Sequence, residues 1–74
     1  MLEAARTTGY RDGMDKGRND AAQFKSSDVN RHDAYKDADR GYRDSYGDKA
    51  AYRVAYRQAF MEGYRAGYRL PGRR

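Results

Sequence analysis

The chain has 74 residues, enough for one small domain that buries only about 60% of the surface its unfolded form exposes. Its net charge of +5 marks a basic chain, and the absence of cysteine excludes a disulfide framework or a thiolate zinc site. Two Leu, two Val and no Ile leave an aliphatic supply typical of disordered proteins, so any core must come from the eight tyrosines.

The first predicted element is a helix over residues 3–25. Small residues return every four positions at Gly9, Gly13 and Gly17, and residues four apart lie on one face of a helix. Each glycine inside a helix costs about 1 kcal/mol relative to alanine, so three on one face indicate close contact with another helix. The neighbouring Arg, Asp and Lys residues exclude a bilayer core as the setting of that contact.

Residues 29–46 are predicted to form a short middle helix. Tyr35, Tyr42 and Tyr46 lie near helical spacing, and several Asp and Arg residues stand four apart, as in stabilising pairs on helix surfaces. The flanking residues include Ser, Gly and Asp, which break a helix or cap the next one. Asp48 is the expected N-terminal cap of the last helix.

The last predicted helix covers residues 48–69 and carries the clearest repeat of the chain. Each four-residue unit presents a small residue and then an aromatic residue, and in four of the five units an arginine follows. The small positions are Ala51, Ala55, Ala59, Gly63 and Gly67, and the aromatic positions are Tyr52, Tyr56, Phe60, Tyr64 and Tyr68. Four residues advance a helix by about 400°, so each stripe winds around it, and a partner helix must cross obliquely or wrap in the right-handed sense.

Together these elements predict an all-α fold, an antiparallel helical hairpin of three helices in a single domain spanning residues 1–74. The first and last helices would pack through the seam of small and aromatic residues. In that orientation the acidic side chains of the first helix, such as Asp12 and Asp20, would lie beside the arginines of the last. Residues 70–74 follow the helix and are expected to form a flexible basic tail.

The sequence offers little material for catalysis, and we expect no enzyme activity. His32 is the only histidine, and no serine stands in a recognisable catalytic context. Oxygen-bearing residues from Asp37 to Asp48 follow the spacing of a calcium loop, but Tyr42 stands where that loop requires glycine. The chain is therefore predicted to have no catalytic residue, metal site, cofactor or small-molecule substrate.

The tyrosine–arginine pairs of the last helix are the sharpest candidate for a binding surface. Residues 50–74 carry six basic residues against one acidic residue, which accounts for the whole positive excess. In one interpretation the tyrosines form the core and the arginines its solvated margin. In the alternative, the arginines bind the phosphates of a polyanion, chiefly nucleic acid, while the rings stack on its bases. The arginines concerned are Arg53, Arg57, Arg65 and Arg69.

The segments Gly9-Tyr10-Arg11-Asp12-Gly13 and Gly63-Tyr64-Arg65-Ala66-Gly67-Tyr68 repeat one motif at both ends of a charged middle. In this the chain resembles small, uncharacterised, often exported bacterial proteins with Gly-Tyr-x-x-Gly repeats. The resemblance implies a small helical protein, with a periplasmic or extracellular location after removal of a signal peptide as one open possibility.

We therefore expect a non-enzymatic structural or interaction protein whose glycine, alanine and tyrosine faces associate with other helices. Its expected partner is itself, in an oligomer or a filament, because a chain with so thin a core is marginal alone. A chain that is disordered in isolation and orders on a partner is a further alternative. No apolar run approaches the roughly 20 residues that a membrane span requires.

Overall fold

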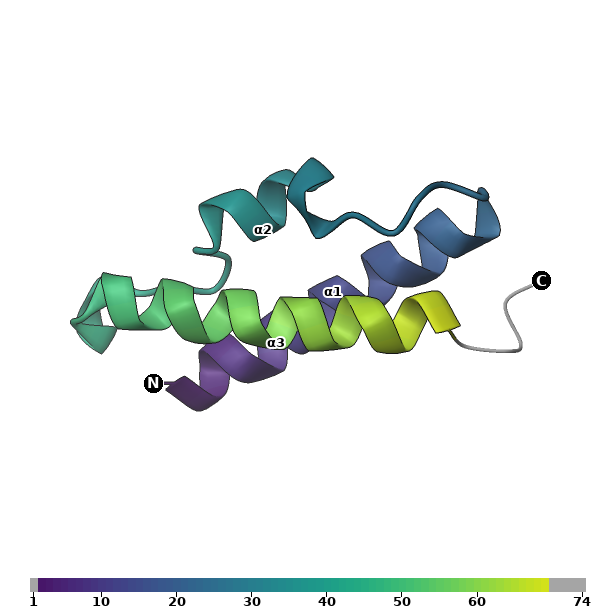
Figure 1. Cartoon of the computed structure of the whole chain (residues 1–74). Helices are drawn as coiled ribbons and strands as arrows, with labels where there is room; N and C mark the ends of the chain where they lie inside the picture. Colours follow the sequence, from purple (N-terminus) through teal and green to yellow (C-terminus); the bar gives the residue numbers. More distant parts are fainter. Residues whose placement is uncertain (1, 70–74) are drawn as a thin grey trace.

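The computed structural model describes residues 2–69, which form three α-helices and two short 3-10 turns without any strand (Figure 1). The helices are α1 at Leu2–Ala22, α2 at Asp33–Asp37 and α3 at Lys49–Arg69, and the turns are η1 at Val29–Arg31 and η2 at Asp44–Tyr46. The predicted all-α class is confirmed. None of these helices has the length and apolarity to cross a membrane, and the predicted basic tail at 70–74 lies outside the described residues.

The two long helices, α1 and α3, pack against each other and run in the same direction (Figure 1). Gly9 lies against Tyr56, and Gly17 lies against Tyr64, so residue numbers rise together along both helices. The predicted antiparallel direction is therefore wrong, although the predicted pairing of the first and last helices is present. The chain returns from the end of α1 to the start of α3 through residues 23–48, which we call the return segment.

The return segment differs from the predicted middle helix over 29–46. Its only α-helix is the five-residue α2, which ends at Ala38 in a left-handed conformation (φ 55°). Gly41 and Gly47 also have positive φ angles, so helical geometry is interrupted at these two residues as well. A largely irregular segment covers more distance per residue than a helix does. The return segment needs this reach because it spans the length of α3, roughly 30 Å.

Glycines hold the backbones of α1 and α3 in direct contact. A Cβ atom on Gly13 would overlap the carbonyl oxygen of Phe60, and one on Gly63 would overlap the carbonyl oxygen of Tyr10. Both helices therefore need glycine at the contact, and the penalty for glycine within a helix is offset by packing that no larger residue permits. In Figure 1 the two helices cross obliquely, as the winding of the stripes predicts.

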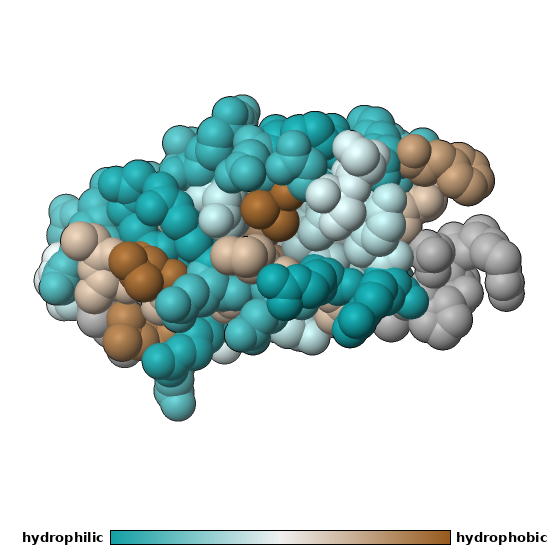
Figure 2. Space-filling view, in the orientation of Figure 1, coloured by the Kyte–Doolittle hydropathy of each residue, from teal (hydrophilic) through white to brown (hydrophobic). Residues whose placement is uncertain are grey.

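Aromatic rings of α3 form the core between the helix pair and the return segment. Tyr52, Tyr56, Phe60 and Tyr64 are almost completely buried, and the rings of Phe60 and Tyr64 are stacked with their centroids 6.5 Å apart. Tyr35 of α2 covers this column, with its ring centroid 5.6 Å from that of Phe60. The outer surface is mainly hydrophilic, and its apolar areas are small and separated in the view of Figure 2.

The backbone contact leads to a stability prediction for Gly13→Ala. Alanine is the better helix former by about 1 kcal/mol, but its methyl group must displace the backbone of α3. We expect the variant to lose about 2 kcal/mol of unfolding free energy, measured by thermal unfolding followed by circular dichroism. Asn19→Ala, at an exposed position of the same helix, is the control and should unfold at or slightly above the wild-type temperature. Equal stability of the two variants would contradict the contact.

Candidate functional site

The polar interior of the molecule is organised around two carboxylates of α1, Asp12 and Asp20. Their side chains are 12% and 5% exposed, respectively. Each accepts a hydrogen bond from a tyrosine hydroxyl of α3 and forms an ion pair with an arginine of the return segment. We call these two groups of residues the Asp12 cluster and the Asp20 cluster.

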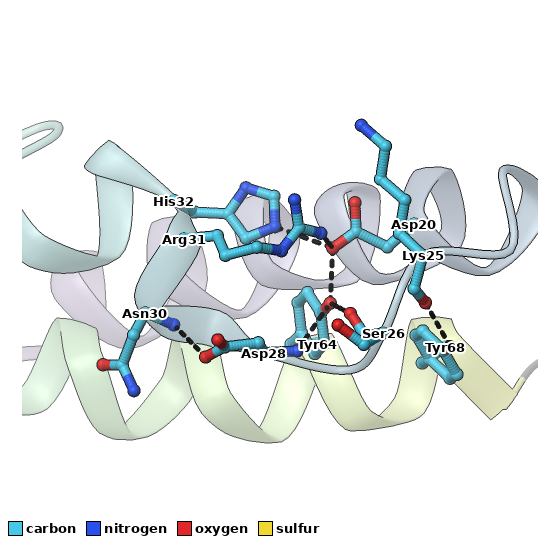
Figure 3. Close-up of polar contacts among 9 residues, drawn as sticks. All are labelled: Asp20, Lys25, Ser26, Asp28, Asn30, Arg31, His32, Tyr64 and Tyr68. Atoms are coloured by element: carbon cyan, nitrogen blue, oxygen red, sulfur yellow. Dashed lines mark hydrogen bonds and ion pairs between the residues drawn. The ribbon is translucent and has the colours of Figure 1, made fainter.

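The Asp20 cluster is the more enclosed of the two (Figure 3). Arg31 donates from Nη2 to Oδ2 of Asp20 over 2.7 Å, and the Nε2 atom of His32 lies 2.8 Å from the same oxygen. The hydroxyl of Tyr64 also donates to this oxygen, and it accepts a hydrogen bond from the backbone N–H of Asp28. Three donors therefore compensate the burial of one carboxylate.

The Asp12 cluster repeats this arrangement nearer the start of the helices. The hydroxyl of Tyr56 donates to Oδ2 of Asp12 over 2.6 Å, and Nε of Arg40 lies 2.8 Å from the same atom. The two carboxylates are eight residues apart on α1, and their tyrosines are eight apart on α3. Arg40 comes after Arg31 in the sequence, but it forms an ion pair with the earlier of the two carboxylates. The order is reversed because the return segment runs against the direction of both helices.

Cluster residues and other residues alternate along both helices, and this alternation determines how α1 and α3 align. Midway between the clusters, α1 carries Lys16 and α3 carries Phe60, which has no hydroxyl. A slip of four residues would preserve the stripe of small residues, but it would place Asp12 at the level of Phe60 and Lys16 at the level of Tyr64. The carboxylate would lose its hydroxyl donor inside the protein, which is costly, so the clusters exclude this alternative alignment.

The clusters also shift the pKa values of Asp20, Tyr56 and Tyr64. Burial alone would raise the pKa of Asp20, but hydrogen bonds from Tyr64, His32 and Arg31 outweigh it and bring the pKa below its usual value. Burial, followed by the hydrogen bond to a carboxylate, raises the pKa of Tyr56 and of Tyr64. The fold thus favours the charged form of Asp20 and the protonated hydroxyls of Tyr56 and Tyr64.

A polar cleft of about 540 Å³ lies between α1 and the return segment, with both clusters at its edge. Its lining residues are Asp12, Asp15, Lys16, Asn19, Arg31, His32, Asp33, Ala34 and Arg40. His32 is 14% exposed and is oriented by Asp20, an arrangement that enzymes use to orient a general base. No hydroxyl or thiol nucleophile lines the cleft, and residues 2–69 contain no cluster of His and acidic residues suited to a metal ion.

The predicted packing residues line the interior of the chain itself. Gly9, Gly13 and Gly17 of α1 are buried against α3. On α3 the buried members are Tyr52, Ala55, Tyr56, Ala59, Phe60, Gly63, Tyr64 and Gly67, whereas Ala51 and Tyr68 are partly exposed. The small and aromatic faces are therefore occupied by intramolecular contacts.

The predicted polyanion-binding arginines fall into two groups. Arg53 donates from Nε to the carbonyl oxygen of Asp37 over 3.1 Å, and Arg57 donates to the carbonyl oxygens of Tyr35 and Lys36. These two guanidinium groups satisfy carbonyls at the end of α2, which a helix leaves without partners. The remaining two, Arg65 and Arg69, are exposed.

Sequence reasoning did not identify the cluster residues as a set. It treated Asp12 and Asp20 as charges that would lie beside arginines of the last helix, and it noted His32 only as the single histidine. In the structure the partners of both carboxylates come from the return segment and from tyrosine hydroxyls. The sequence did contain one signal of the clusters. The two acidic residues are eight positions apart, and so are the two tyrosines that lie on either side of Phe60.

Asp20→Asn should lower stability at neutral pH by about 2 kcal/mol, because charge-assisted hydrogen bonds to a buried group are removed. The pKa of Asp20 is lower in the folded state, so its contribution is complete above the unfolded value of about 4 and is lost as pH falls through the folded value. The variant should therefore lose less stability on acidification than wild type does, in urea unfolding measured between pH 7 and pH 3. Asp15→Asn, at an exposed position, is the control. Parallel pH profiles for wild type and Asp20→Asn would contradict this role.

The buried tyrosines predict unfolding at alkaline pH. Because folding raises the pKa of Tyr56 and Tyr64, the unfolded chain loses protons first, and stability falls as pH rises above about 10. We expect the tyrosinate absorbance of these two residues to appear together with the loss of helical circular dichroism. Complete ionisation of all tyrosines in a chain that remains helical would contradict the burial of these hydroxyls.

Comparison of the chain with protein-family models, curated proteins and solved structures found no match. The resemblance to exported proteins with Gly-Tyr-x-x-Gly repeats therefore stays a prediction. The two clusters and the glycine contact give the interior a structural role, so a functional proposal must rest on the surfaces that the helix pair leaves open.

Proposed function

We propose that this protein is a non-enzymatic interaction module that associates with a second copy of itself through the outer groove between α1 and α3. The observation that carries this proposal is that the return segment covers one side of the helix pair, while the other side is an open groove of about 580 Å³. The groove is formed by Arg6, Thr7, Tyr10 and Arg11 of α1 and by Ala55, Gln58, Ala59 and Glu62 of α3.

We assign self-association to this groove, whereas the sequence analysis assigned it to the glycine–tyrosine faces. Those faces are buried within the chain, so a second copy reaches only their edge, at Ala55 and Ala59. Small side chains in the floor permit close approach of another helix, and Tyr10, which is 39% exposed, supplies an apolar wall with a polar end. Val54, one helical turn before Gln58 of the groove, is 55% exposed.

Charge favours a second copy as the occupant. Arg6 lies at the start of the α1 wall and Glu62 at the end of the α3 wall, and among the described residues neither forms an ion pair. A twofold axis across the groove reverses the direction of both helices in the second copy and sets α1 opposite α1 and α3 opposite α3. Arg6 of each copy then comes level with Glu62 of the other, so the interface is self-complementary and closes as a dimer.

Charge reversal tests this arrangement. Arg6→Glu should weaken the dimer about tenfold because it places like charges together twice, and the double variant Arg6→Glu/Glu62→Arg should restore association. Sedimentation velocity from micromolar to millimolar concentration gives the dissociation constants. Arg43→Glu, at an exposed position in the return segment, makes the same change in net charge outside the groove and is the control.

A cysteine introduced into this cysteine-free chain tests the same geometry independently. Gln58→Cys lies in the groove and should form an intermolecular disulfide rapidly under mild oxidation, whereas Lys36→Cys on α2 should not. A wild-type chain that stays monomeric at millimolar concentration, or equal cross-linking of the two variants, would overturn the proposal. Growth into larger assemblies would indicate a head-to-tail contact instead and would contradict the twofold arrangement.

The alternative function, polyanion binding by a row of four arginines on α3, is supported for only half of that row. Arg53 and Arg57 bind backbone carbonyls of α2, whereas Arg65 and Arg69 remain exposed near the end of α3. A polyanion would therefore have to bind at that end of the molecule rather than along the whole helix.

A further inference from the structure

The turn that ends α1 contains a residue that its local geometry does not favour. The backbone N–H of Lys25 donates to the carbonyl oxygen of Asp20 over 2.8 Å, and that of Phe24 donates to Ala21 over 3.1 Å. These are the two hydrogen bonds of a Schellman motif, in which the residue at the position of Phe24 adopts a left-handed conformation and is usually glycine. Phe24 has φ 60° and is 94% exposed.

Phenylalanine at this position lowers the stability of the fold for two reasons. Its Cβ strains the left-handed backbone, and its ring remains in water without contributing to the core. Glycine would remove both costs without disturbing either hydrogen bond of the turn. A strained residue that brings the fold no packing in return indicates a role outside the fold.

The surroundings of Phe24 are basic because α1 and α3 are parallel. Both helices end on the same side of the molecule, and the hydroxyl of Tyr68 donates to the carbonyl oxygen of Lys25, which joins the two ends. Within residues 2–69, the exposed basic side chains in or directly after the last two turns of these helices include Arg18, Lys25, Arg65 and Arg69. Figure 2 shows apolar surface projecting where α1 ends, beside hydrophilic surface.

We propose that this basic end of the molecule binds single-stranded nucleic acid, with the ring of Phe24 stacked on a base and the four basic side chains contacting phosphates. An exposed ring face next to a basic surface is the combination by which proteins bind single strands without reading their sequence. This site does not depend on the outer groove, since none of its residues lines that groove.

A single strand fits this end better than a lipid bilayer does. Phe24 is the only large apolar side chain exposed in the turn, and its neighbours Gln23, Ser26 and Ser27 are polar and exposed. Insertion into a bilayer needs a wider apolar footprint or a second anchor, whereas stacking needs one ring with both faces accessible. The polar neighbours are suited to hydrogen bonds with base edges or sugars.

Replacement of Phe24 by glycine separates binding from stability. We expect Phe24→Gly to weaken binding of fluorescein-labelled oligo(dT) and oligo(U), measured by anisotropy, by about 5- to 100-fold, the effect of losing one stacked base. The same variant should unfold at a temperature about 5 °C above wild type, because strain at the turn is relieved. Phe24→Trp restores a stackable ring and should bind as wild type does.

The phosphate contacts are tested by salt dependence. Arg65→Gln/Arg69→Gln should weaken binding and make the slope of log affinity against log salt shallower by about 1.4, or 0.7 for each phosphate of a single strand that is no longer neutralised. Arg43→Gln, at an exposed position outside this end, is the control and should leave the slope unchanged.

Three outcomes would overturn the proposal. One is an absence of binding to either oligonucleotide at low salt by wild-type protein. Another is a Phe24→Gly variant that binds as tightly as wild type. The third is binding to vesicles of phosphatidylcholine and phosphatidylserine without binding to oligonucleotides, which would assign this end to a membrane surface. None of these results bears on dimer formation through the outer groove, which sedimentation measures separately.

Discussion

Direct contact between the backbones of α1 and α3 is the constraint on which the rest of this structure depends. Glycines on both helices make that contact possible, and a Cβ atom at Gly13 or Gly63 would overlap a carbonyl oxygen of the other helix. Because the small side chains leave no space between the helices, the large rings of α3 must all lie to one side of the contact. The return segment then covers those rings, and a core poor in Leu, Ile and Val can still exclude water.

A stripe that repeats every four residues stabilises several alignments almost equally, and buried polar groups distinguish between them. Asp12 and Asp20 each need a hydroxyl donor, which α3 supplies at Tyr56 and Tyr64 but not at Phe60. Single buried polar residues set register in coiled coils by the same principle. This protein has two such buried polar residues, and arginines from the return segment complete each cluster. The alignment of the helices and the path of the return segment are therefore coupled.

Two of the surfaces that residues 2–69 leave open differ in chemistry. The outer groove has a floor of small side chains and walls of mixed charge, which suits another helix. The end at which α1 and α3 both terminate combines one exposed ring with basic side chains, which suits an anionic chain carrying flat bases. Parallel helices make the second surface possible, because an antiparallel pair would place Lys25 and Arg69 at opposite ends of the molecule.

The sequence by itself determined the helical class, the three-helix order, and the contact face of α1 and α3, because a four-residue period and the cost of glycine in helices are local properties. It did not determine that the helices are parallel. A stripe of small residues has no direction, and the short α2 with its irregular flanks follows from left-handed residues such as Ala38 that carry no sequence signal. Only tertiary structure brought His32 to Asp20, since that contact depends on how the return segment folds back over the aromatic rings.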